Sequence, residues 1–366
     1  MAQSKPLYRI VYDDIYGKIK KKYYCDGIIP AEAELMRDYQ ACRNIVRQAL
    51  LLLERDGLVI KQRGRRATVN PQAIRPPQAK FKLLFLTHTA SDFNNPIYQE
   101  IYGALRVEAA RHETAIEPFI ITRQSGEEHD AIDRVGAADG IFSTYLRGSN
   151  LSPELRQTIA SKPYKLAVDH CLNGLIGSAV CTDSYLGGRM AAEHLLRLGC
   201  RKPALPACHP FLYSYSPLLE RCLGFRDALE EAGMPLQEEP ILFSANPRNF
   251  YNVRASIEEL LKTQPDTDGI FCLTDQFAAA AAFALEDLGY RVPGDMALIG
   301  FDGIKPESFP GGQDIGLTTI RQRVETIGAE AFHVLTRQLV AGKPENVLIR
   351  IAPELQPGKT TTNRKG

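Results

Sequence analysis

The apolar residues near the N-terminus recur at the three- and four-residue spacing of amphipathic helices over two short stretches. The first stretch predicts a helix that opens at Pro30, where the fixed backbone of proline suits a first turn. Glu32 and Glu34 would lie at the positive N-terminal end of this helix. Leu35 and Tyr39 would face inward.

A second helical pattern runs from about Cys42 and has two chemically different faces. The apolar stripe, which predicts packing on a core, consists of Ile45, Val46, Ala49, Leu50, Leu52 and Leu53. The opposite face carries Arg43, Asn44, Arg47 and Gln48. Because Arg, Asn and Gln side chains pair with base edges in the major groove of DNA, this face is a candidate recognition surface. A solvated polar face is the alternative interpretation.

Two short β-prone segments, residues 58–60 and 67–69, follow the second helix and flank a basic turn. Gly64 would form the tip of this hairpin, with Arg63 and Arg65 beside it. Two short helices followed by a basic hairpin form the arrangement of a winged helix-turn-helix. The hairpin, or wing, would reach a neighbouring groove or the phosphates.

The charge distribution favours the DNA-binding interpretation. Residues 1–75 contain 15 Lys and Arg against 8 Asp and Glu, a net charge of +7, whereas the whole 366-residue chain carries +1. The other 291 residues therefore contain 29 basic and 35 acidic residues, a net charge of −6. A positive charge concentrated on one small domain is typical of phosphate binding, and an even mixture would not produce it.

A polar, proline-bearing stretch at residues 71–80 predicts a linker between a DNA-binding domain of residues 1–70 and a larger domain of residues 81–366. In the larger domain, short buried-strand patterns alternate with amphipathic-helix patterns. The expected strands are residues 81–87, 115–121, 140–142, 164–168, 178–182, 203–207, 241–243, 269–273 and 296–300. The expected helices are residues 97–111, 184–198, 218–232, 252–262 and 276–288. This alternation predicts an α/β fold with two doubly wound parallel sheets, each with helices on both faces.

Polar residues directly after the strands are candidate ligand contacts, because ligands in such folds bind beyond the carboxyl ends of the strands. These residues are Asp92, Phe93, Asn94, Asn95, Asp169, Asp183, Thr274, Asp275, Gln276 and Asp302. Carboxylates and amides beside an aromatic ring suit a polyhydroxylated ligand, since they bond its hydroxyls while the ring covers its apolar face. Asp183 and Asp275 each precede a helix and fit better as N-terminal caps.

Composition and motifs count against secreted proteins, membrane proteins and several classes of enzyme. Eight cysteines without paired spacing predict a reducing environment. The chain has no signal-peptide pattern and no apolar run near 18 residues, so we expect a cytoplasmic protein without a membrane segment. The nucleotide-binding and hydrolase motifs G-x-G-x-x-G, G-x-S-x-G and the P-loop are absent.

Two groups of residues could suggest catalysis or metal binding. Asp169-His170-Cys171 could form a thiol dyad, but neighbours on a strand point to opposite faces. Cys200, Cys208 and His209 do not have a usual zinc spacing and lack a fourth ligand. The sequence therefore predicts no enzyme, no catalytic residue, no cofactor and no metal site.

Residues 8–69 resemble the DNA-binding domain of the GntR family of bacterial transcription regulators over its whole length. The matching motifs are Pro30-Ala31-Glu32, Cys42-Arg43-Asn44-Ile45-Val46-Arg47, Leu53 to Leu58, and Gly64. The resemblance implies that Arg43 and Arg47 contact operator bases or phosphates, helped by Arg63 and Gly64. Cys42 stands where the family usually has a capping Ser or Thr, so we expect a helix start that is less firmly held.

Residues 81 to about 355 resemble the ligand-binding domain of LacI-type repressors, which is related to periplasmic sugar-binding proteins. The matching motifs are Asn95-Pro96, Asp183 with Gly187-Gly188, His194-Leu195-Leu196, Arg221 with Gly224-Phe225, Thr274-Asp275-Gln276, Val292 to Asp295, Ile299 to Asp302 and Leu317 to Ile320. The resemblance implies an effector cleft lined by Asp169, Arg221, Thr274, Gln276 and Asp302, with Asp92 and Phe93 nearby.

Together the two resemblances imply a ligand-responsive repressor, since this combination is seen in arabinose repressors of the AraR type. Such a protein would bind a pseudo-palindromic operator as a homodimer, and a sugar would close the two lobes and change the spacing of the winged domains. A sugar-binding or transport-type protein without DNA regulation is the alternative. The positive N-terminal domain and the absence of a signal-peptide pattern count against it.

Overall fold

A computed structural model describes residues 6–20, 23–24, 27–61, 66–70, 80–88, 93–121, 127–144, 146, 151–170, 177–208, 216–236, 242–243, 250–309 and 312–362. The chain divides into two compact units, Met1–Ala79 and Lys80–Gly366. Arg63, Gly64 and Arg65 of the expected wing, the expected linker up to residue 79, and Asp92 lie outside the described residues.

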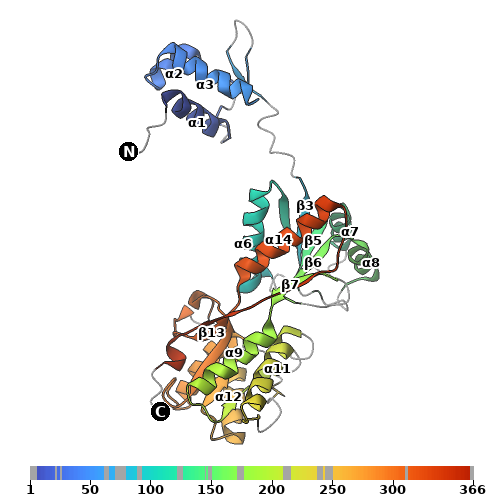
Figure 1. Cartoon of the computed structure of the whole chain (residues 1–366), viewed down its shortest axis with the longest axis vertical. Coiled ribbons are helices and arrows are strands. Elements are labelled where there is room, and N and C mark those ends of the chain that lie inside the picture. The colour runs from blue at the N-terminus through green and yellow to red at the C-terminus, as the bar shows by residue number, and fades with distance from the viewer. Residues whose placement is uncertain are drawn as a thin grey trace. The chain divides into compact units, whose positions relative to one another are not determined.

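The first unit is a small helical domain with a two-stranded hairpin (Figure 1). Its described elements are α1 (Leu7–Lys20), α2 (Glu32–Asp38), α3 (Arg43–Arg55), β1 (Val59–Ile60) and β2 (Thr68–Val69). The hydrophobic pattern had predicted all of these except α1, which packs against α3 and adds Val11 and Ile15 to the core around Leu53. β1 and β2 are antiparallel, with Val59 opposite Val69.

The N-cap residues of α2 and α3 make no side-chain capping bond. The predicted start at Pro30 is wrong by two residues, because α2 begins at Glu32 and Ala31 is its N-cap. Glu34 instead reaches back, and its Oε2 accepts a hydrogen bond from the Ala31 amide at 2.7 Å. Cys42 is the N-cap of α3 and makes no side-chain capping bond, as expected for cysteine.

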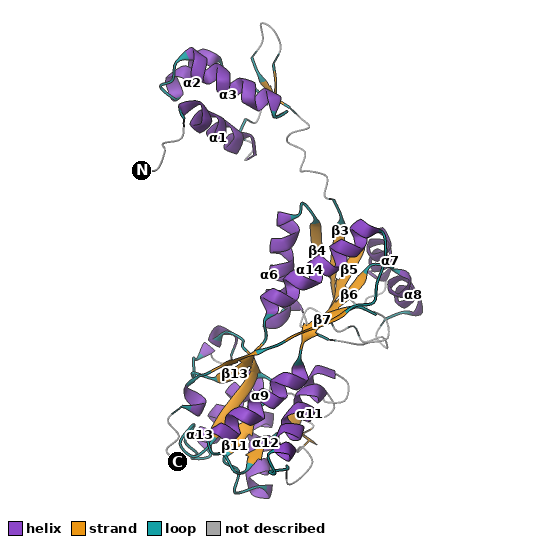
Figure 2. Cartoon of the chain, viewed as in Figure 1, coloured by secondary structure: helices purple, strands orange, loops and turns teal. Residues whose placement is uncertain are grey.

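The second unit folds into two lobes, the first of which we call the N-lobe. Its six-stranded sheet has the order β14-β7-β6-β5-β3-β4, with every neighbouring pair parallel. The strands are β3 (Lys82–Thr87), β4 (Ala115–Ile120), β5 (Gly140–Ser143), β6 (Lys165–Val168), β7 (Ala179–Thr182) and β14 (Leu348–Ile351). The helices are α6 (Pro96–Arg111), α7 (Glu127–Ala137), α8 (Pro153–Ser161) and α14 (Val324–Ala341) (Figure 2).

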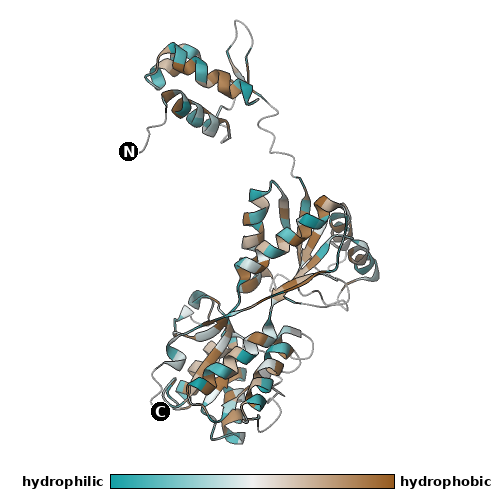
Figure 3. Cartoon of the chain, in the orientation of Figure 1, coloured by the Kyte–Doolittle hydropathy of each residue, from teal (hydrophilic) through white to brown (hydrophobic). Residues whose placement is uncertain are grey.

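Alternation along the strands explains why helices cover both faces of the N-lobe sheet. Leu83 and Phe85 belong to the core formed with α6 and α14, whereas Leu84 and Leu86 belong to the core formed with α7 and α8. Successive side chains of a strand point to opposite faces, so a strand buried on both sides is continuously apolar. Figure 3 shows the strands among the most hydrophobic parts of the unit.

The second lobe, the C-lobe, has a five-stranded sheet in the order β15-β13-β12-β11-β8. Its strands are β8 (Pro203–Ala204), β11 (Gly269–Phe271), β12 (Ala297–Asp302), β13 (Thr318–Arg321) and β15 (Glu354–Gln356). Its helices are α9 (Ser184–Arg197), α11 (Ser216–Glu231), α12 (Phe250–Thr263) and α13 (Asp275–Asp287). Phe271 and Ile299 pack with α9 and α11, and Ile270 and Leu298 pack with α12 and α13. The two-sheet α/β prediction is therefore confirmed.

Several elements differ from the expectation. β15 runs antiparallel to β13, so the C-lobe sheet is not wholly parallel. The expected strand at residues 203–207 is split between β8 and β9 (Ala207–Cys208), and β9 pairs in parallel with β10 (Leu242–Phe243). β12 extends to Asp302, which was expected to follow the strand.

The helices α7, α8 and α14 were not expected. α8 does carry a readable start signal, because Ser152 accepts a hydrogen bond from the Leu155 amide at 3.1 Å and Pro153 is its first residue. α14 lacks such a signal, since its N-cap Arg323 makes no side-chain capping bond. It ends at Ala341 and is capped by Gly342, whose left-handed backbone (φ 64°) suits glycine.

Two expectations from composition can be compared with the structure. No helix within the described parts of the chain has the length and apolar character that crossing a membrane requires. Cys42, Cys222 and Cys272 carry free thiols, but Cys181 is disulfide-bonded. The cysteine spacing had not predicted a disulfide.

The chain passes between the lobes at three places within its described part: from β7 to α9, from β13 to α14, and from β14 to β15 (Figure 1). Asp183 lies in the first of these connections and caps α9, where its Oδ1 accepts a hydrogen bond from the Leu186 amide at 2.9 Å. The prediction that Asp183 is a cap is confirmed.

α9 and α11 approach each other at glycines on both helices. A Cβ atom on Gly188 would lie 2.1 Å from the carbonyl oxygen of Arg221, and one on Gly224 would lie 1.9 Å from the carbonyl oxygen of Tyr185. Backbone atoms cannot rotate away as the end of a side chain can, so the close packing requires glycine. The close packing of α9 and α11 at these two glycines therefore determines the position of Arg221 on α11.

We predict that Gly188→Ala lowers the free energy of unfolding by about 1–3 kcal/mol, because the added methyl group forces α9 and α11 apart. Urea denaturation measures the change. Gly103→Ala in α6 is the matched control, since its Cβ would meet no atom within 4 Å. It should be neutral or stabilising by up to about 1 kcal/mol. Equal stability of the two variants would contradict the proposed packing constraint.

Candidate functional site

The first candidate site is the exposed face of α3. Arg43, Asn44, Arg47 and Gln48 are all exposed, whereas Val46, Ala49, Leu50 and Leu53 on the other side of the helix are buried. The helix is thus packed by one face and presents the four predicted polar side chains to solvent. This geometry suits a helix that enters the major groove.

Glu32 at the start of α2 organises the cations of this face. Its Oε2 lies 3.0 Å from Nε of Arg47 and 3.7 Å from Nε of Arg43, and its Oε1 lies 3.9 Å from Nζ of Lys61. One carboxylate therefore gathers positive groups from α3 and from the end of β1. Exposed ion pairs contribute only about 0–1 kcal/mol, so DNA phosphates can replace Glu32 at little cost. The sequence had suggested only a helix-end role for Glu32.

The second candidate site lies at the carboxyl end of the C-lobe strands and is built around Arg221. This side chain is 3% exposed, and its Nη2 lies 3.2 Å from Oδ1 of Asp302, which is 14% exposed. Nη1 donates to the carbonyl oxygen of Leu273 at 2.5 Å, and the guanidinium lies 3.6 Å from the centre of the Phe301 ring. The buried Nε of Arg221 has no hydrogen-bond partner among the described residues.

A buried donor without a protein partner is unfavourable by about 1–3 kcal/mol, which is why such groups are rare outside functional sites. Arg221 therefore retains a hydrogen-bonding capacity that a bound oxygen atom can satisfy. Arg221 and Asp302 were both predicted as effector contacts, and the structure brings them together.

A chain of polar contacts runs from this pair to the segments that connect the lobes. Nε2 of Gln322 donates to Oδ1 of Asp302 at 2.9 Å, and Oε1 of Gln322 accepts from the hydroxyl of Thr182. Gln322 follows β13 in the connection to α14, and Thr182 ends β7 in the connection to α9. Sequence reasoning missed both residues, although each is a polar residue at the end of a buried strand.

Asp275 is completely buried near the charge of Asp302 and does not cap α13, which corrects the prediction. Its Oδ2 accepts hydrogen bonds from the amides of Gly303 (2.7 Å) and Ile304 (2.9 Å), and its Oδ1 accepts from the Thr319 hydroxyl at 2.6 Å. Asp275 thereby holds the loop that follows Asp302. The cap of α13 is Thr274, whose hydroxyl accepts from the Phe277 amide at 3.3 Å.

Burial shifts the titration of both carboxyl groups. Removal from water raises the pKa of Asp275 to about 7, and the nearby Asp302 charge adds to the shift. Burial also raises the pKa of Asp302, while the charge of Arg221 and the hydrogen bond from Gln322 oppose that increase. Because Arg221 favours the charged form of Asp302, Asp302 is better suited than Asp275 to accept hydrogen bonds from a ligand as a carboxylate.

The N-lobe contributes a second polar edge, at the ends of β3, β5 and β6. Asp169 follows β6 and is buried, and the buried hydroxyls of Thr87 and Ser143 have no hydrogen-bond partner among the described residues. Ser143 lies opposite Leu86 in the register, next to Thr87, so the two hydroxyls share one edge of the sheet. The sequence had singled out Asp169 but neither hydroxyl residue.

His170 has a structural role beside Asp169. Its Nδ1 donates to the carbonyl oxygen of Val168 at 3.0 Å, and burial lowers its pKa to about 4, so the ring is neutral. Cys171, the other half of the thiol dyad weighed above, lies outside the described residues.

Two of the predicted carboxylates have unusual backbone conformations. Asp169 has φ 69° and Asp302 has φ 124°, in a region that residues with a Cβ atom rarely adopt. Such conformations persist only where the surrounding structure holds them, and they cluster at ligand sites. Each carboxylate is thus positioned at the expense of local strain.

The other described residues predicted as effector contacts are partly buried and lie at or just before the starts of two helices. Thr274 and Gln276 flank the buried Asp275 and are partly exposed at the start of α13. Phe93 is partly buried ahead of α6, with its ring centre 6.0 Å from that of Tyr102. Asp92 lies outside the described residues.

Comparisons with protein families agree with this division of the chain. Residues 7–69 match the model of bacterial regulatory proteins of the gntR family. Residues 192–361 match the model of a periplasmic binding protein-like domain. The matching families contain regulators rather than enzymes.

Three relatives are similar to parts of this chain. The regulator CelR of Thermobifida fusca is 27% identical over 274 residues, 72% of this chain and 75% of its own length. The ribose operon repressor of Halalkalibacterium halodurans is 30% identical over 54% of this chain, and the repressor PurR of Actinobacillus pleuropneumoniae is 29% identical over 50%. The chain spans about half the length of these last two proteins, 56% and 53% respectively.

Solved structures share the fold. A complex of the regulator CelR with cellobiose superposes with a TM-score of 0.63 at 20% identity, covering 88% of this chain and 92% of that chain. A LacI family regulator of Enterococcus faecium with bound ribose gives a TM-score of 0.61 at 21% identity, over 78% of this chain and 100% of that chain.

We predict that the stability of the wild-type protein falls relative to Asp275→Asn as the pH rises from about 4 to 7. The folded pKa is raised to about 7, while an unfolded aspartate titrates near 3.9. Between these values the folded state holds a proton that the unfolded state has lost, so raising the pH favours unfolding. Urea midpoints of both proteins at pH 5 and pH 8 measure this effect, and a pH-independent difference would contradict it.

Proposed function

Because the chain joins a gntR-family DNA-binding domain to a periplasmic-binding-protein-like domain of the LacI type, we propose that it is a sugar-responsive transcriptional repressor. It binds operator DNA as a homodimer through its N-terminal unit. A sugar bound between the two lobes of the second unit changes its affinity for that DNA. The absence of a membrane-spanning helix in the described residues is compatible with a cytoplasmic location.

The DNA-binding proposal rests on the exposed face of α3. Arg43 and Arg47 lie on a helix whose other face is fixed in the core, so their positions relative to a bound groove are determined by the fold. Lys61 and Arg66, at the two ends of the wing, add positive charge beside them. Asn44 and Gln48 supply amides that can read adenine, whereas the arginines can read guanine or phosphate.

The single observation that carries the effector proposal is the buried pair of Arg221 and Asp302, in which Nε of Arg221 has no hydrogen-bond partner within the described part of the chain. A carboxylate accepts bonds from two sugar hydroxyls, and a guanidinium donates to a third oxygen. Asp169 and the hydroxyls of Thr87 and Ser143 offer further groups from the N-lobe. Cellobiose and ribose, found with two structural relatives, belong to this ligand class.

The contacts of Gln322 support the proposed coupling between sugar binding and DNA binding. A ligand changes a conformational equilibrium only through a difference in affinity between the two forms. A sugar that bonds Asp302 and Arg221 from one lobe and Asp169 from the other favours the closed form. Gln322 and Thr182 connect Asp302 to two of the lobe-connecting segments. Closure then changes the spacing of the two DNA-binding units of a dimer.

A sugar-binding or transport-type protein without DNA regulation is the second candidate function. The same cleft would serve it equally well. It does not account for the exposed arginines on α3 or for the net charge of +7 on residues 1–75. Operator binding distinguishes the two functions.

We predict that Arg47→Ala weakens operator binding by about 1–3 kcal/mol, because it removes a charged contact from the recognition face. The operator is first selected from a random-sequence DNA library, and affinity is then measured by gel shift at fixed salt. Arg55→Ala is the matched control, since Arg55 is an exposed arginine in the last turn of the same helix. Equal operator affinities of the two variants would show that Arg47 does not contribute to operator binding.

We predict that Asp302→Asn abolishes the rise in melting temperature that a sugar produces, while leaving operator binding intact. The probes are L-arabinose, D-ribose and cellobiose, with hypoxanthine as the non-sugar comparison. Arg221→Ala should behave likewise, but it leaves Asp302 buried without its cation and lowers stability as well.

Arg254→Ala is the control for this experiment, because Arg254 lies on α12 and pairs with Asp287, outside the cleft. A sugar-induced shift that survives in Asp302→Asn would exclude this cleft. The wild-type protein could also bind its operator and respond only to hypoxanthine. That result would support the proposed transcriptional regulation but contradict a sugar as the effector.

A further inference from the structure

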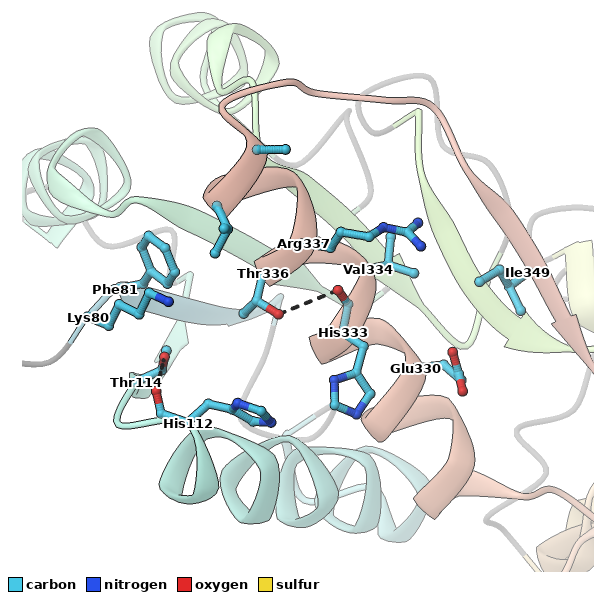
Figure 4. A pocket seen from close by; sticks show the side chains of 12 residues that line it. Lys80, Phe81, His112, Thr114, Glu330, His333, Val334, Thr336, Arg337 and Ile349 are labelled. Carbon is cyan, nitrogen blue, oxygen red and sulfur yellow. Dashed lines mark hydrogen bonds between the residues drawn. The ribbon is translucent and has the colours of Figure 1, made fainter.

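Three potential metal ligands meet between α6 and α14, outside both candidate sites. Glu108 lies in the last turn of α6, His112 is the C-cap of that helix, and His333 comes from α14. One ligand atom from each residue lies within 4.8 Å of the others. Figure 4 shows the rings of His112 and His333 projecting into the space between the two helices.

The separations in this cluster fit a shared ion better than direct hydrogen bonds. Oε2 of Glu108 lies 3.9 Å from Nε2 of His112 and 3.6 Å from Nε2 of His333. Nitrogen and oxygen atoms that share a hydrogen bond lie about 2.7–3.2 Å apart. Two ligands of one tetrahedral zinc ion, each about 2.0–2.1 Å from the metal, lie roughly 3.4 Å apart. Small side-chain rotations would bring all three atoms to that distance.

The surroundings hold two of the ligands in place. Oε1 of Glu108 accepts a hydrogen bond from Arg111 at 2.6 Å, which leaves Oε2 turned toward the imidazoles. Glu108 is buried, so its position is restricted by packing. The ring of His112 lies 5.4 Å from that of the buried Phe332. Outer contacts of this kind orient the ligands of metal sites.

We propose that Glu108, His112 and His333 bind a divalent transition-metal ion, with zinc as the best fit. Two imidazoles and one carboxylate suit Zn²⁺, whereas Mg²⁺ and Ca²⁺ prefer oxygen ligands alone. A hollow of about 570 Å³, lined by both histidines and by Glu330, adjoins the cluster and leaves room for a fourth ligand (Figure 4). The sequence had predicted no metal site.

Such an ion would join two helices at the entrance to the second unit. His112 is the C-cap of α6. The backbone carbonyl oxygen of the next residue, Glu113, accepts a hydrogen bond from the Lys80 amide at 2.9 Å. Lys80 is the first residue of the second unit. The ion would therefore fasten the end of α6, together with the backbone that enters the lobe, to the middle of α14.

The test uses the full chain without a polyhistidine tag, in a Cys42→Ser background that removes the exposed thiol. After treatment with EDTA, ZnCl₂ is titrated by calorimetry at pH 7.5. We expect one Zn²⁺ per chain, and binding at least about 10-fold weaker in His112→Asn and in His333→Asn. His129→Asn is the matched control, because His129 is an exposed histidine on α7.

Melting temperature gives an independent measurement. Zn²⁺ should raise it in the parent protein and in His129→Asn, but not in the two site variants, because an ion that binds only the folded state stabilises it. MgCl₂ should have no such effect. Circular dichroism verifies that each variant is folded. Absence of Zn²⁺ binding, or equal affinity in all the variants, would overturn the proposal and leave only a polar contact between Glu108 and the two histidines.

Discussion

The proposed effector site in the C-lobe depends on the buried ion pair between Arg221 and Asp302. Removing either charge from water is costly, so the pair persists only with additional partners. Leu273, Phe301 and Gln322 supply them from three different segments. Glycines at the crossing of α9 and α11 set the position of Arg221, and the loop held by Asp275 sets that of Asp302.

The DNA-facing surface uses the opposite electrostatic arrangement. Glu32 holds Arg43, Arg47 and Lys61 through exposed pairs, which are weak and readily exchanged for phosphate. The effector pair is rigid because it is buried, whereas the recognition face is adaptable because it is hydrated. Each environment suits the ligand that we propose for it, a small neutral sugar in one case and a polyanion in the other.

Local patterns predicted most of the elements, and their failures have local causes. The period of apolar residues predicted α3 and most strands of both sheets, because a helix or strand must bury one face or both. It did not predict β13, β14 and β15. α14 was missed because its N-cap makes no side-chain capping bond. Thr274 took the capping role expected of Asp275, since either can cap α13, and the amides of Gly303 and Ile304 with the Thr319 hydroxyl hold Asp275 inside the lobe.

The sequence by itself determined the two-part architecture, the polar face of α3 and the choice of strand-end carboxylates as candidate contacts. These features depend on neighbouring residues and on the period of a single element. Only the tertiary structure decided that Gln322 and Thr182 meet near Asp302, that Glu32 gathers three cations, and that His333 approaches Glu108 and His112. Such groups come from segments distant in the chain, and only the packing of helices and sheets brings them together.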